Sequence, residues 1–265
     1  MKLTISLGQM DVKLAEPAAN LATVAAMTAE AARRGSDVVV FPELWSTGYD
    51  LANAARYATP LDAGIFAETA VLAKKHRIHI LGSCLSLLGE GRFGNTAVLF
   101  APDGRILADY SKTHLFRLMQ EEQYLTAGDK LTLVMTDWGQ WGLAICYDLR
   151  FPELFRRYAL AGANLVFLPS EWPHPRLAHW RTLLRARAIE NQMFMVACNR
   201  VGESGGTRFF GHSTIVDPWG ELALELGKGE MLGTAVLDLS LVAEVRAKIP
   251  VFADRRPELY GMIED

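Results

Sequence analysis

Two segments of the chain repeat one pattern of helix, glycine, apolar strand and proline. They are "GSDVVVFPEL" (35–44) and "GANLVFLPSE" (162–171), and each follows a helical segment, "TAEAARRG" or "ELFRRYALAG". An uninterrupted apolar run is typical of a strand that is covered on both faces. The repeat predicts an α/β chain with two pseudo-symmetric halves, in which strand ends from both halves converge on one site. The alternative is a chance match of a common αβ pattern.

The remaining sequence also alternates between strand-like and helix-like segments. Strands are expected over 2–10 and 78–88, helices over 20–35 and 62–77, and hairpins over 93–112 and 211–226. The hairpin turns are Pro-Asp-Gly and Asp-Pro-Trp-Gly, and Gly35 is expected to end the first helix. No linker or shift in composition divides the chain, so residues 1–265 are predicted to form a single domain.

Charge and cysteine content exclude several classes of protein. The net charge of −3 gives no basic field that would attract nucleic acid or an anionic membrane. The N-terminal segment is too short and polar for a signal peptide, and no apolar run approaches the roughly 18 residues of a membrane span. Three widely spaced cysteines, Cys84, Cys146 and Cys198, argue against a disulfide framework or a zinc site. They are typical of a protein of the reducing cytoplasm.

Cys146 is the candidate nucleophile. It ends the apolar run of "GLAICYDLRFPEL" (142–154), and a helical segment begins directly after the following turn. A sharp turn from strand to helix lifts a side chain out of the sheet, beside backbone N–H groups that favour a thiolate and bind an oxyanion. The alternative is a buried thiol that only packs, since free cysteine is among the most buried residue types. Cys84 and Cys198 lie within strands and are predicted to be core residues.

The sequence offers two candidates for the base that takes the thiol proton. His114 follows a strand end in "YSKTHLF", but no carboxylate lies at a recognisable spacing to orient it. Glu43 follows proline at the end of an all-apolar strand, where burial would raise its pKa toward that of a general base. Lys112 ends another strand and could stabilise an oxyanion beside a carboxylate and a thiolate. A capping role for Glu43 and a solvated position for Lys112 are the alternatives.

Three motifs in this order give the sequence a resemblance to the nitrilase superfamily of carbon–nitrogen hydrolases. They are "FPELWSTGY" around Glu43, "YSKTHLF" around Lys112 and "GLAICYDLRFPEL" around Cys146. Supporting segments such as "EEQYLTAGD" and "GHSTIVDPWGE" extend the likeness over nearly the whole chain. The resemblance implies a four-layer αββα sandwich, with two protomers joined into an αββααββα homodimer.

The resemblance also implies a role for each motif residue. Glu43 is the general base and acid, Lys112 stabilises the oxyanion, Cys146 is the nucleophile, and the backbone N–H of Tyr147 is a second oxyanion donor. The superfamily often has a further glutamate seven residues before a glycine, and Glu121 matches this position relative to Gly128. The neighbouring Glu122 is the alternative. The reaction implied is amide hydrolysis through a thioester, without a metal or an organic cofactor.

Within the superfamily, "CYDLRFPE" and "IPVFADRRPELY" are most similar to the omega-amidase branch, which hydrolyses amides such as 2-oxoglutaramate and 2-oxosuccinamate. Such a substrate carries a carboxylate, so a cation is expected in the pocket. The candidates are the arginines of loops and turns, Arg117, Arg150, Arg176 and Arg208. Candidate pocket walls are Tyr49, Phe116 and Trp172. The alternatives are hydrolysis of deaminated glutathione or of an N-carbamoyl compound, a catalytically silent binding protein, and a Cys-His peptidase that uses His114.

Overall fold

The computed structural model of the chain describes residues 1–260, so the last five residues of the predicted domain lie outside the described residues. Two six-stranded sheets dominate the fold. The first has the order β14 (Met231–Asp238), β1 (Lys2–Gln9), β2 (Val38–Val40), β3 (His79–Gly89), β4 (Arg92–Phe100) and β5 (Ile106–Ser111). The second has the order β6 (Leu133–Thr136), β7 (Gly139–Leu143), β8 (Ala163–Ser170), β9 (Phe194–Asn199), β12 (Thr214–Val216) and β13 (Leu222–Glu225).

The two sheets repeat one topology. From β14 to β5, the successive strand pairs are antiparallel, parallel, parallel, antiparallel and antiparallel. The same sequence of pairings runs from β6 to β13. In this correspondence β2 matches β8, the two strands that carry the repeated sequence pattern. The pseudo-symmetry predicted from the repeat is confirmed, and the match is not a coincidence of sequence.

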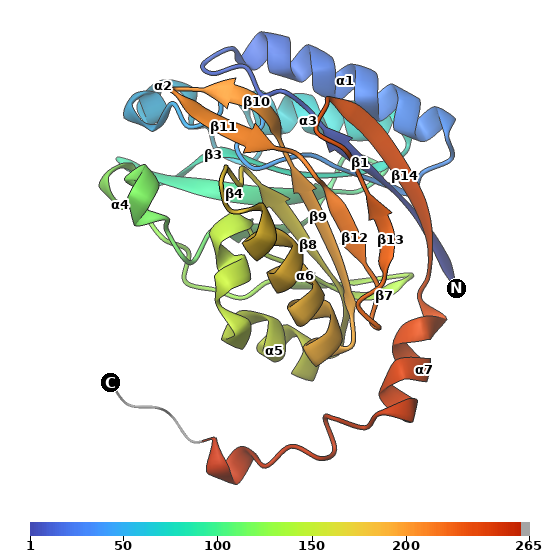
Figure 1. The fold of residues 1–265 in the computed structure, drawn as a ribbon. Coiled ribbons are helices and arrows are strands. Elements are labelled where there is room, and N and C mark those ends of the chain that lie inside the picture. Colours follow the sequence, from blue (N-terminus) through green and yellow to red (C-terminus); the bar gives the residue numbers. More distant parts are fainter. Residues whose placement is uncertain (261–265) are drawn as a thin grey trace.

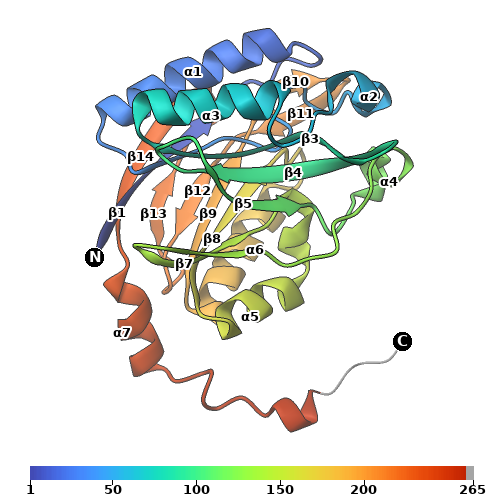
Figure 2. The same ribbon diagram turned by 180° about the vertical axis from the view of Figure 1, so that it is seen from behind.

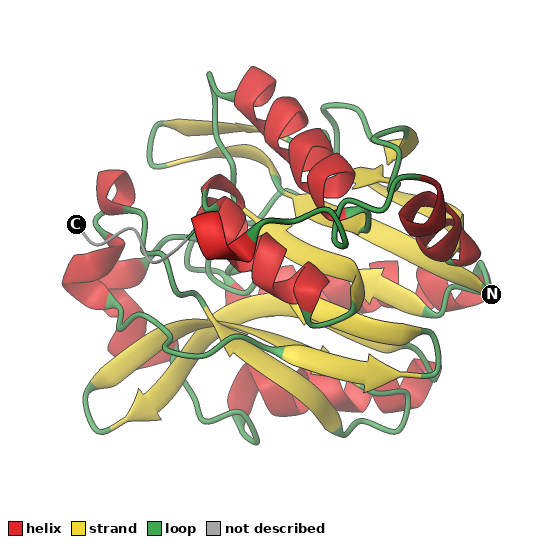
Figure 3. Cartoon of the chain, turned by 90° about the horizontal axis from the view of Figure 1, so that it is seen from below, coloured by secondary structure: helices red, strands yellow, loops and turns green. Residues whose placement is uncertain are grey.

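Helices cover the outer faces of both sheets (Figures 1 and 2). Helices α1 (Pro17–Arg33) and α3 (Gly64–His76) pack on the first sheet, and α5 (Pro152–Leu160) and α6 (Leu177–Asn191) pack on the second. Figure 3 shows the layers from below. The inward side chains of the first sheet, including Leu3, Ile5 and Val38, join one buried cluster with residues of the second, such as Leu143 and Phe167. The predicted αββα sandwich is confirmed.

Most elements lie where the sequence predicts them. Both hairpins form, as β4–β5 and β12–β13. Gly35 follows the end of α1 with φ +75°, a conformation that is easy only for glycine.

The sequence patterns did not predict α6, β6, β14 or α7 (Ser240–Lys248). Several further elements that they missed are short. They are α2 (Ala54–Tyr57), α4 (Glu121–Tyr124), the hairpin β10 (Val201–Ser204) with β11 (Thr207–Phe210), and the 3₁₀ turns Leu51–Asn53, Arg117–Met119, Cys146–Arg150 and Pro257–Leu259.

The last described α-helix is α7 (Ser240–Lys248), and residues 249–260 run outside the two sheets (Figure 1). Phe252 still packs against the protein, between the guanidinium groups of Arg156 and Arg246 at 5.4 and 5.2 Å from its ring centre. None of the helices within residues 1–260 combines the length and the apolar character that crossing a membrane requires.

Candidate active site

Three strand ends bring the candidate residues together between the two sheets. Glu43 follows β2, Lys112 follows β5, and Cys146 follows β7. The Nζ atom of Lys112 lies 2.8 Å from Oε1 of Glu43, and both side chains are fully buried. Cys146 is 6% exposed, and the charges of Glu43 and Lys112 both shift the pKa of its thiol. The prediction that distant strand ends converge on one site therefore holds for these three residues.

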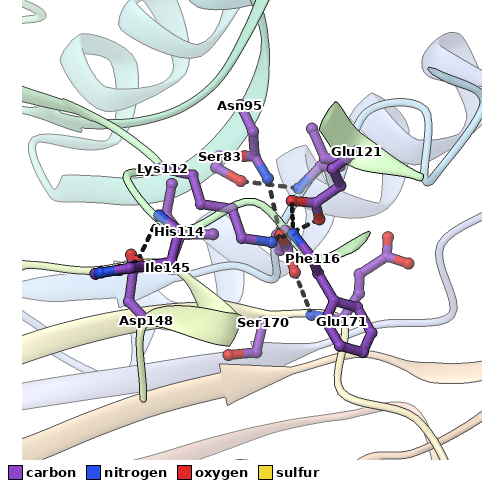
Figure 4. Close-up of polar contacts among 12 residues, drawn as sticks. Ser83, Asn95, Lys112, His114, Phe116, Glu121, Ile145, Asp148, Ser170 and Glu171 are labelled. Atoms are coloured by element: carbon purple, nitrogen blue, oxygen red, sulfur yellow. Dashed lines mark hydrogen bonds and ion pairs between the residues drawn. The ribbon is translucent and has the colours of Figure 1, made fainter. Parts of the chain in front are cut away.

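The carboxylate of Glu43 is held by donors from several elements. Its Oε1 atom accepts hydrogen bonds from Asn95 Nδ2 (2.8 Å), Lys112 Nζ (2.8 Å) and the Tyr49 hydroxyl (3.0 Å). Its Oε2 atom accepts one from the backbone N–H of Glu171 at 2.9 Å. Figure 4 shows this convergence, with Asn95 reaching in from β4 and Glu171 from the end of β8. The fold therefore holds this carboxylate in one position without a substrate, which is the preorganisation that a catalytic group requires.

A second carboxylate shares the lysine. Oε1 of Glu121 lies 2.6 Å from Lys112 Nζ and also accepts a hydrogen bond from the Tyr49 hydroxyl at 2.6 Å. Its Oε2 atom accepts one from the backbone N–H of Phe116 at 2.8 Å. Glu121 is fully buried, whereas the neighbouring Glu122 is exposed. The structure thus brings Glu121, and not Glu122, to the other candidate residues.

Burial and neighbouring charges act in opposite directions on the lysine and on Glu121. Burial alone would lower the pKa of Lys112, but the charges of Glu121 and Glu43 outweigh it and raise the pKa above its ordinary value. Burial raises the pKa of Glu121, and the charge of Lys112 offsets only part of this effect. These charges therefore keep Lys112 in its cationic form, and a fixed cation of this kind can stabilise a developing negative charge.

Removing this cation is expected to destabilise the fold. Lys112→Met leaves two buried carboxylates facing each other, so the free energy of unfolding at pH 7 should fall by about 3–5 kcal/mol. The loss should shrink at pH 5, because lowering the pH protonates carboxyls whose pKa values rise without the ammonium. Urea unfolding at the two pH values measures both effects.

Lys130→Met is the matched control for this change. Lys130 pairs with Asp109 at 2.8 Å, but its side chain is 58% exposed. Loss of such a pair should cost less than about 1 kcal/mol, because solvent screens it. Equal losses in the two variants would contradict the structural importance of the buried cation.

Cys146 lies at the turn that the sequence predicts. Strand β7 ends at Leu143, a 3₁₀ turn begins at Cys146 itself, and α5 begins at Pro152. Cys146 has φ +43°, in the left-handed region that residues other than glycine rarely adopt. The expectation that the turn would favour the thiolate is wrong. Burial and the nearby charge of Glu43 raise the pKa of the thiol well above its ordinary value, against the smaller effect of Lys112.

The buried carboxylate of Asp148 ties this turn to the segment after Lys112. It accepts hydrogen bonds from the backbone N–H groups of Ile145 (2.8 Å) and His114 (3.2 Å). It also accepts hydrogen bonds from the hydroxyl groups of Tyr110 (2.9 Å) and Thr113 (3.2 Å). Its third kind of contact is with His114 Nδ1 at 2.7 Å. Figure 4 shows Asp148, Ile145 and His114 in this arrangement. No sequence pattern indicated that His114 has a carboxylate partner. Its ring stacks on Phe151 at 3.6 Å, and it is not among the residues that line the pocket at Cys146.

A small pocket opens at Cys146. Its lining residues are Phe116, Cys146, Tyr147, Arg150, Glu171, Trp172, Pro173 and Arg176. Phe116 and Trp172 therefore form walls, as predicted. Tyr49 does not line this pocket, because its hydroxyl is turned to Glu43 and Glu121. Arg117 and Arg208 lie in neighbouring grooves.

Arg150 and Arg176 place positive charge in the pocket. The guanidinium of Arg150 lies 4.8 Å from the centre of the Trp172 ring, and that of Arg176 lies 5.6 Å from the centre of the Phe116 ring. Burial and the charge of Arg176 lower the pKa of Arg150. Neither guanidinium pairs with a carboxylate of residues 1–260. Two adjacent cations without an acidic partner make the pocket suitable for an anion.

The residues that can act on a substrate are thus a thiol, two carboxylates, a lysine and two arginines. Among residues 1–260, no group of three or more His, Cys, Asp or Glu side chains is arranged to hold a metal ion. Sequence patterns did not identify Asn95, Asp148 or Glu171, because each is recognisable only by what it contacts across the fold.

The chain is similar to known proteins in both sequence and fold. A sequence model of the carbon–nitrogen hydrolase family matches residues 4–247. The chain is 43% identical over 260 residues to a 2-oxoglutaramate amidase of Bacillus subtilis, covering 98% of this chain and 100% of that protein. Its fold is similar to that of XC1258 of Xanthomonas campestris, a CN-hydrolase superfamily protein solved with an arsenic adduct in the active site (TM-score 0.90, 31% identity, 97% and 98% of the two chains).

A second solved structure bears on the cysteine. It is a glutamate-to-glutamine mutant of an amidase from Nesterenkonia sp. AN1, in which the acetamide moiety of fluoroacetamide is covalently added at the active-site cysteine. The TM-score is 0.86 at 28% identity, covering 97% of this chain and 95% of that one.

Proposed function

Since the chain belongs to the carbon–nitrogen hydrolase family and acts on amides, we propose that Cys146 is its nucleophile, with Glu43 as general base and acid and Lys112 as oxyanion stabiliser. The observation that supports this most strongly is the buried contact of Lys112 with Glu43 and Glu121 beside the thiol. Acyl transfer by a thiol needs a base and a cation close to the sulfur, and here both are held there out of contact with water.

Each group has a defined step in the proposed reaction. Glu43 takes the thiol proton while the sulfur attacks the amide carbon, which suits a thiol whose raised pKa keeps it protonated at rest. Lys112 and the backbone N–H of Tyr147 stabilise the oxyanion. Glu43 then donates its proton to the departing nitrogen. Ammonia is released, and the acyl group remains bound to Cys146 as a thioester. Water hydrolyses the thioester with Glu43 again as base, which releases the acid and restores the thiol.

We propose a small carboxylate-bearing amide, such as 2-oxoglutaramate or 2-oxosuccinamate, as the substrate. Two observations support it: the similarity to the 2-oxoglutaramate amidase and the unpaired arginines of the pocket. Deaminated glutathione and N-carbamoyl compounds could use the same triad, and a silent binding protein could share the fold.

A panel of substrates tests the proposal. The chain should release one ammonia per 2-oxoglutaramate or succinamate, with kcat/KM at least about 10-fold above that for butyramide, because only the acids reach the arginines. A higher kcat/KM for a carbamoyl compound or for deaminated glutathione would replace the substrate assignment. No turnover of any amide would favour a binding protein.

The arginine pair is expected to control KM. Arg150→Gln or Arg176→Gln should raise KM for succinamate about 10- to 100-fold, which corresponds to the free energy of one charge-assisted hydrogen bond. Turnover of butyramide should stay nearly unchanged. Arg117→Gln is the control, since Arg117 lies outside the pocket. An equal effect on the acid and on butyramide would mean that the arginines do not bind the carboxylate.

We further infer one catalytic domain over residues 1–265, paired as a homodimer in the cytoplasm. One hydrophobic cluster that includes residues of both sheets supports the single domain. The free cysteines Cys84, Cys146 and Cys198 support a reducing compartment. The dimer rests on the resemblance of the sequence, and the particle mass in solution tests it.

A further inference from the structure

Glu171 is a buried carboxyl that the proposed reaction does not use. It follows Ser170 at the end of β8, is 1% exposed, and lines the pocket at Cys146. In the repeated topology β8 matches β2, so Glu171 lies one residue beyond the position equivalent to Glu43. The two strand ends meet, because the backbone N–H of Glu171 donates to Oε2 of Glu43 at 2.9 Å.

This contact concerns the oxygen of Glu43 that is available for proton transfer. Oε1 already accepts from Asn95, Lys112 and Tyr49, so its lone pairs are occupied. Among residues 1–260, the Glu171 N–H is the one hydrogen-bond donor to Oε2. Oε2 is therefore the oxygen with room for the Cys146 proton, and its position depends on residue 171.

The side chain of Glu171 is anchored by Arg200, which follows β9 and is fully buried. Nη1 of Arg200 lies 3.1 Å from Oε2 of Glu171. The guanidinium is itself held by the carbonyl groups of Val12 and Val201, by Ser204 Oγ and by Asp11 Oδ1, and it lies 4.3 Å from the centre of the Phe209 ring. A guanidinium fixed on so many sides gives the Glu171 side chain a rigid anchor.

The charges around Glu171 do not balance. The connected buried groups are three carboxyls, of Glu43, Glu121 and Glu171, and two cations, of Lys112 and Arg200. Burial raises the pKa of Glu171 to about 8, against the opposing charge of Arg200 and with a further increase from Glu43. Its Oε1 atom is buried without a hydrogen-bond partner in the described part of the chain, which penalises the ionised form. Burial, the charge of Glu43 and the unpartnered oxygen thus all favour the protonated form of Glu171.

We propose that Glu171, anchored by Arg200, is a positioning residue for the general base: it holds its own N–H against Oε2 of Glu43, the oxygen that takes the Cys146 proton. This rests on the role of Glu43 proposed above. Glu171 must also stay uncharged for the base to work, because a further negative charge beside Glu43 opposes ionisation of Cys146.

Two variants separate the anchoring from the charge. Glu171→Ala removes the anchor and should lower kcat for succinamate about 10- to 100-fold with KM changed less than about 2-fold, since the change displaces Glu43 and leaves Arg150 and Arg176 in place to bind the substrate carboxylate. Glu171→Gln keeps the shape of the neutral acid and an acceptor for Arg200. It should retain nearly full kcat at pH 7.

The pH profile distinguishes this role from a merely structural one. In the wild type, kcat/KM should fall above about pH 8, where Glu171 ionises among Glu43, Lys112, Tyr49, Cys146 and Arg200. Glu171→Gln should remove that fall. Glu203→Gln is the control, because Glu203 lies near Arg200 in the sequence but its side chain is 58% exposed, and it should keep the wild-type profile.

Two results would overturn the proposal. One is an alkaline fall in Glu171→Gln equal to that of the wild type, and the other is a kcat for Glu171→Ala within about 2-fold of the wild type. The pH dependence of Cys146 alkylation by iodoacetamide should show the same difference between wild type and Glu171→Gln without any substrate. A wrong substrate assignment would abolish ammonia release in every variant and leave this difference intact.

Discussion

Cys146→Ala is expected to lower ammonia release from succinamate by at least about 10⁴-fold, because no other group in the pocket can form the thioester. Cys146→Ser should be nearly as impaired, since Glu43 would have to deprotonate a far weaker acid. The measurement is ammonia released per folded protein, with the fold checked by circular dichroism. Mass spectrometry after brief exposure to substrate should detect an acyl adduct in the wild type and none in Cys146→Ala.

The other cysteines provide the control. Cys84 and Cys198 are 2% and 0% exposed, and burial raises the pKa of Cys84 to about 12 and also raises that of Cys198. Cys84→Ala and Cys198→Ala should therefore lose some stability and little activity. An acyl adduct on either residue, or ammonia release that persists in Cys146→Ala, would show that Cys146 is not the nucleophile.

Glu43→Gln is expected to reduce kcat/KM for amide hydrolysis by about 10²- to 10⁴-fold, the usual contribution of a general acid–base. The amide keeps the shape of the side chain but can neither take the thiol proton nor protonate ammonia. Alkylation of Cys146 by iodoacetamide should continue, with its pH midpoint shifted downward. This follows because the charge of Glu43 raises the pKa of the thiol, and the charge of Lys112 remains to lower it.

His114→Gln tests the competing assignment. His114 has the carboxylate partner that a Cys-His pair needs, but its Nδ1 atom is directed at Asp148 and the ring stacks on Phe151. The variant should keep kcat within about 10-fold of the wild type. Loss of activity in His114→Gln together with full activity in Glu43→Gln would reverse the roles of the two residues.

The fold was largely predictable because its signals are local. An apolar run closed by proline marks both β2 and β8, and the turn residues mark both long hairpins. The burial of Glu43 could be predicted for the same reason, since a carboxylate that directly follows a buried strand has little chance to reach water.

What the sequence could not predict depends on contacts between distant segments. Tyr49 had the features of a pocket wall, but its hydroxyl bridges the carboxylates of Glu43 and Glu121, the second of which lies 72 residues away in the sequence. Asp148 was not recognised as the partner of His114, because only the packing of the two sheets brings residues 114 and 148 together. The thiolate predicted at Cys146 from local geometry is disfavoured, since burial and the charge of Glu43 raise the pKa of the thiol.

The left-handed backbone at Cys146 has an evolutionary consequence. A residue with a side chain costs about 1–2 kcal/mol in this conformation, whereas glycine adopts it freely. A descendant that abandoned catalysis would thus be more stable with glycine than with alanine at this position, a difference that thermal unfolding of Cys146→Gly and Cys146→Ala can measure. Drift would favour that loss in any lineage released from the need for the reaction. Under the role proposed for Cys146, the strained turn is a cost in stability that the reaction imposes on the fold.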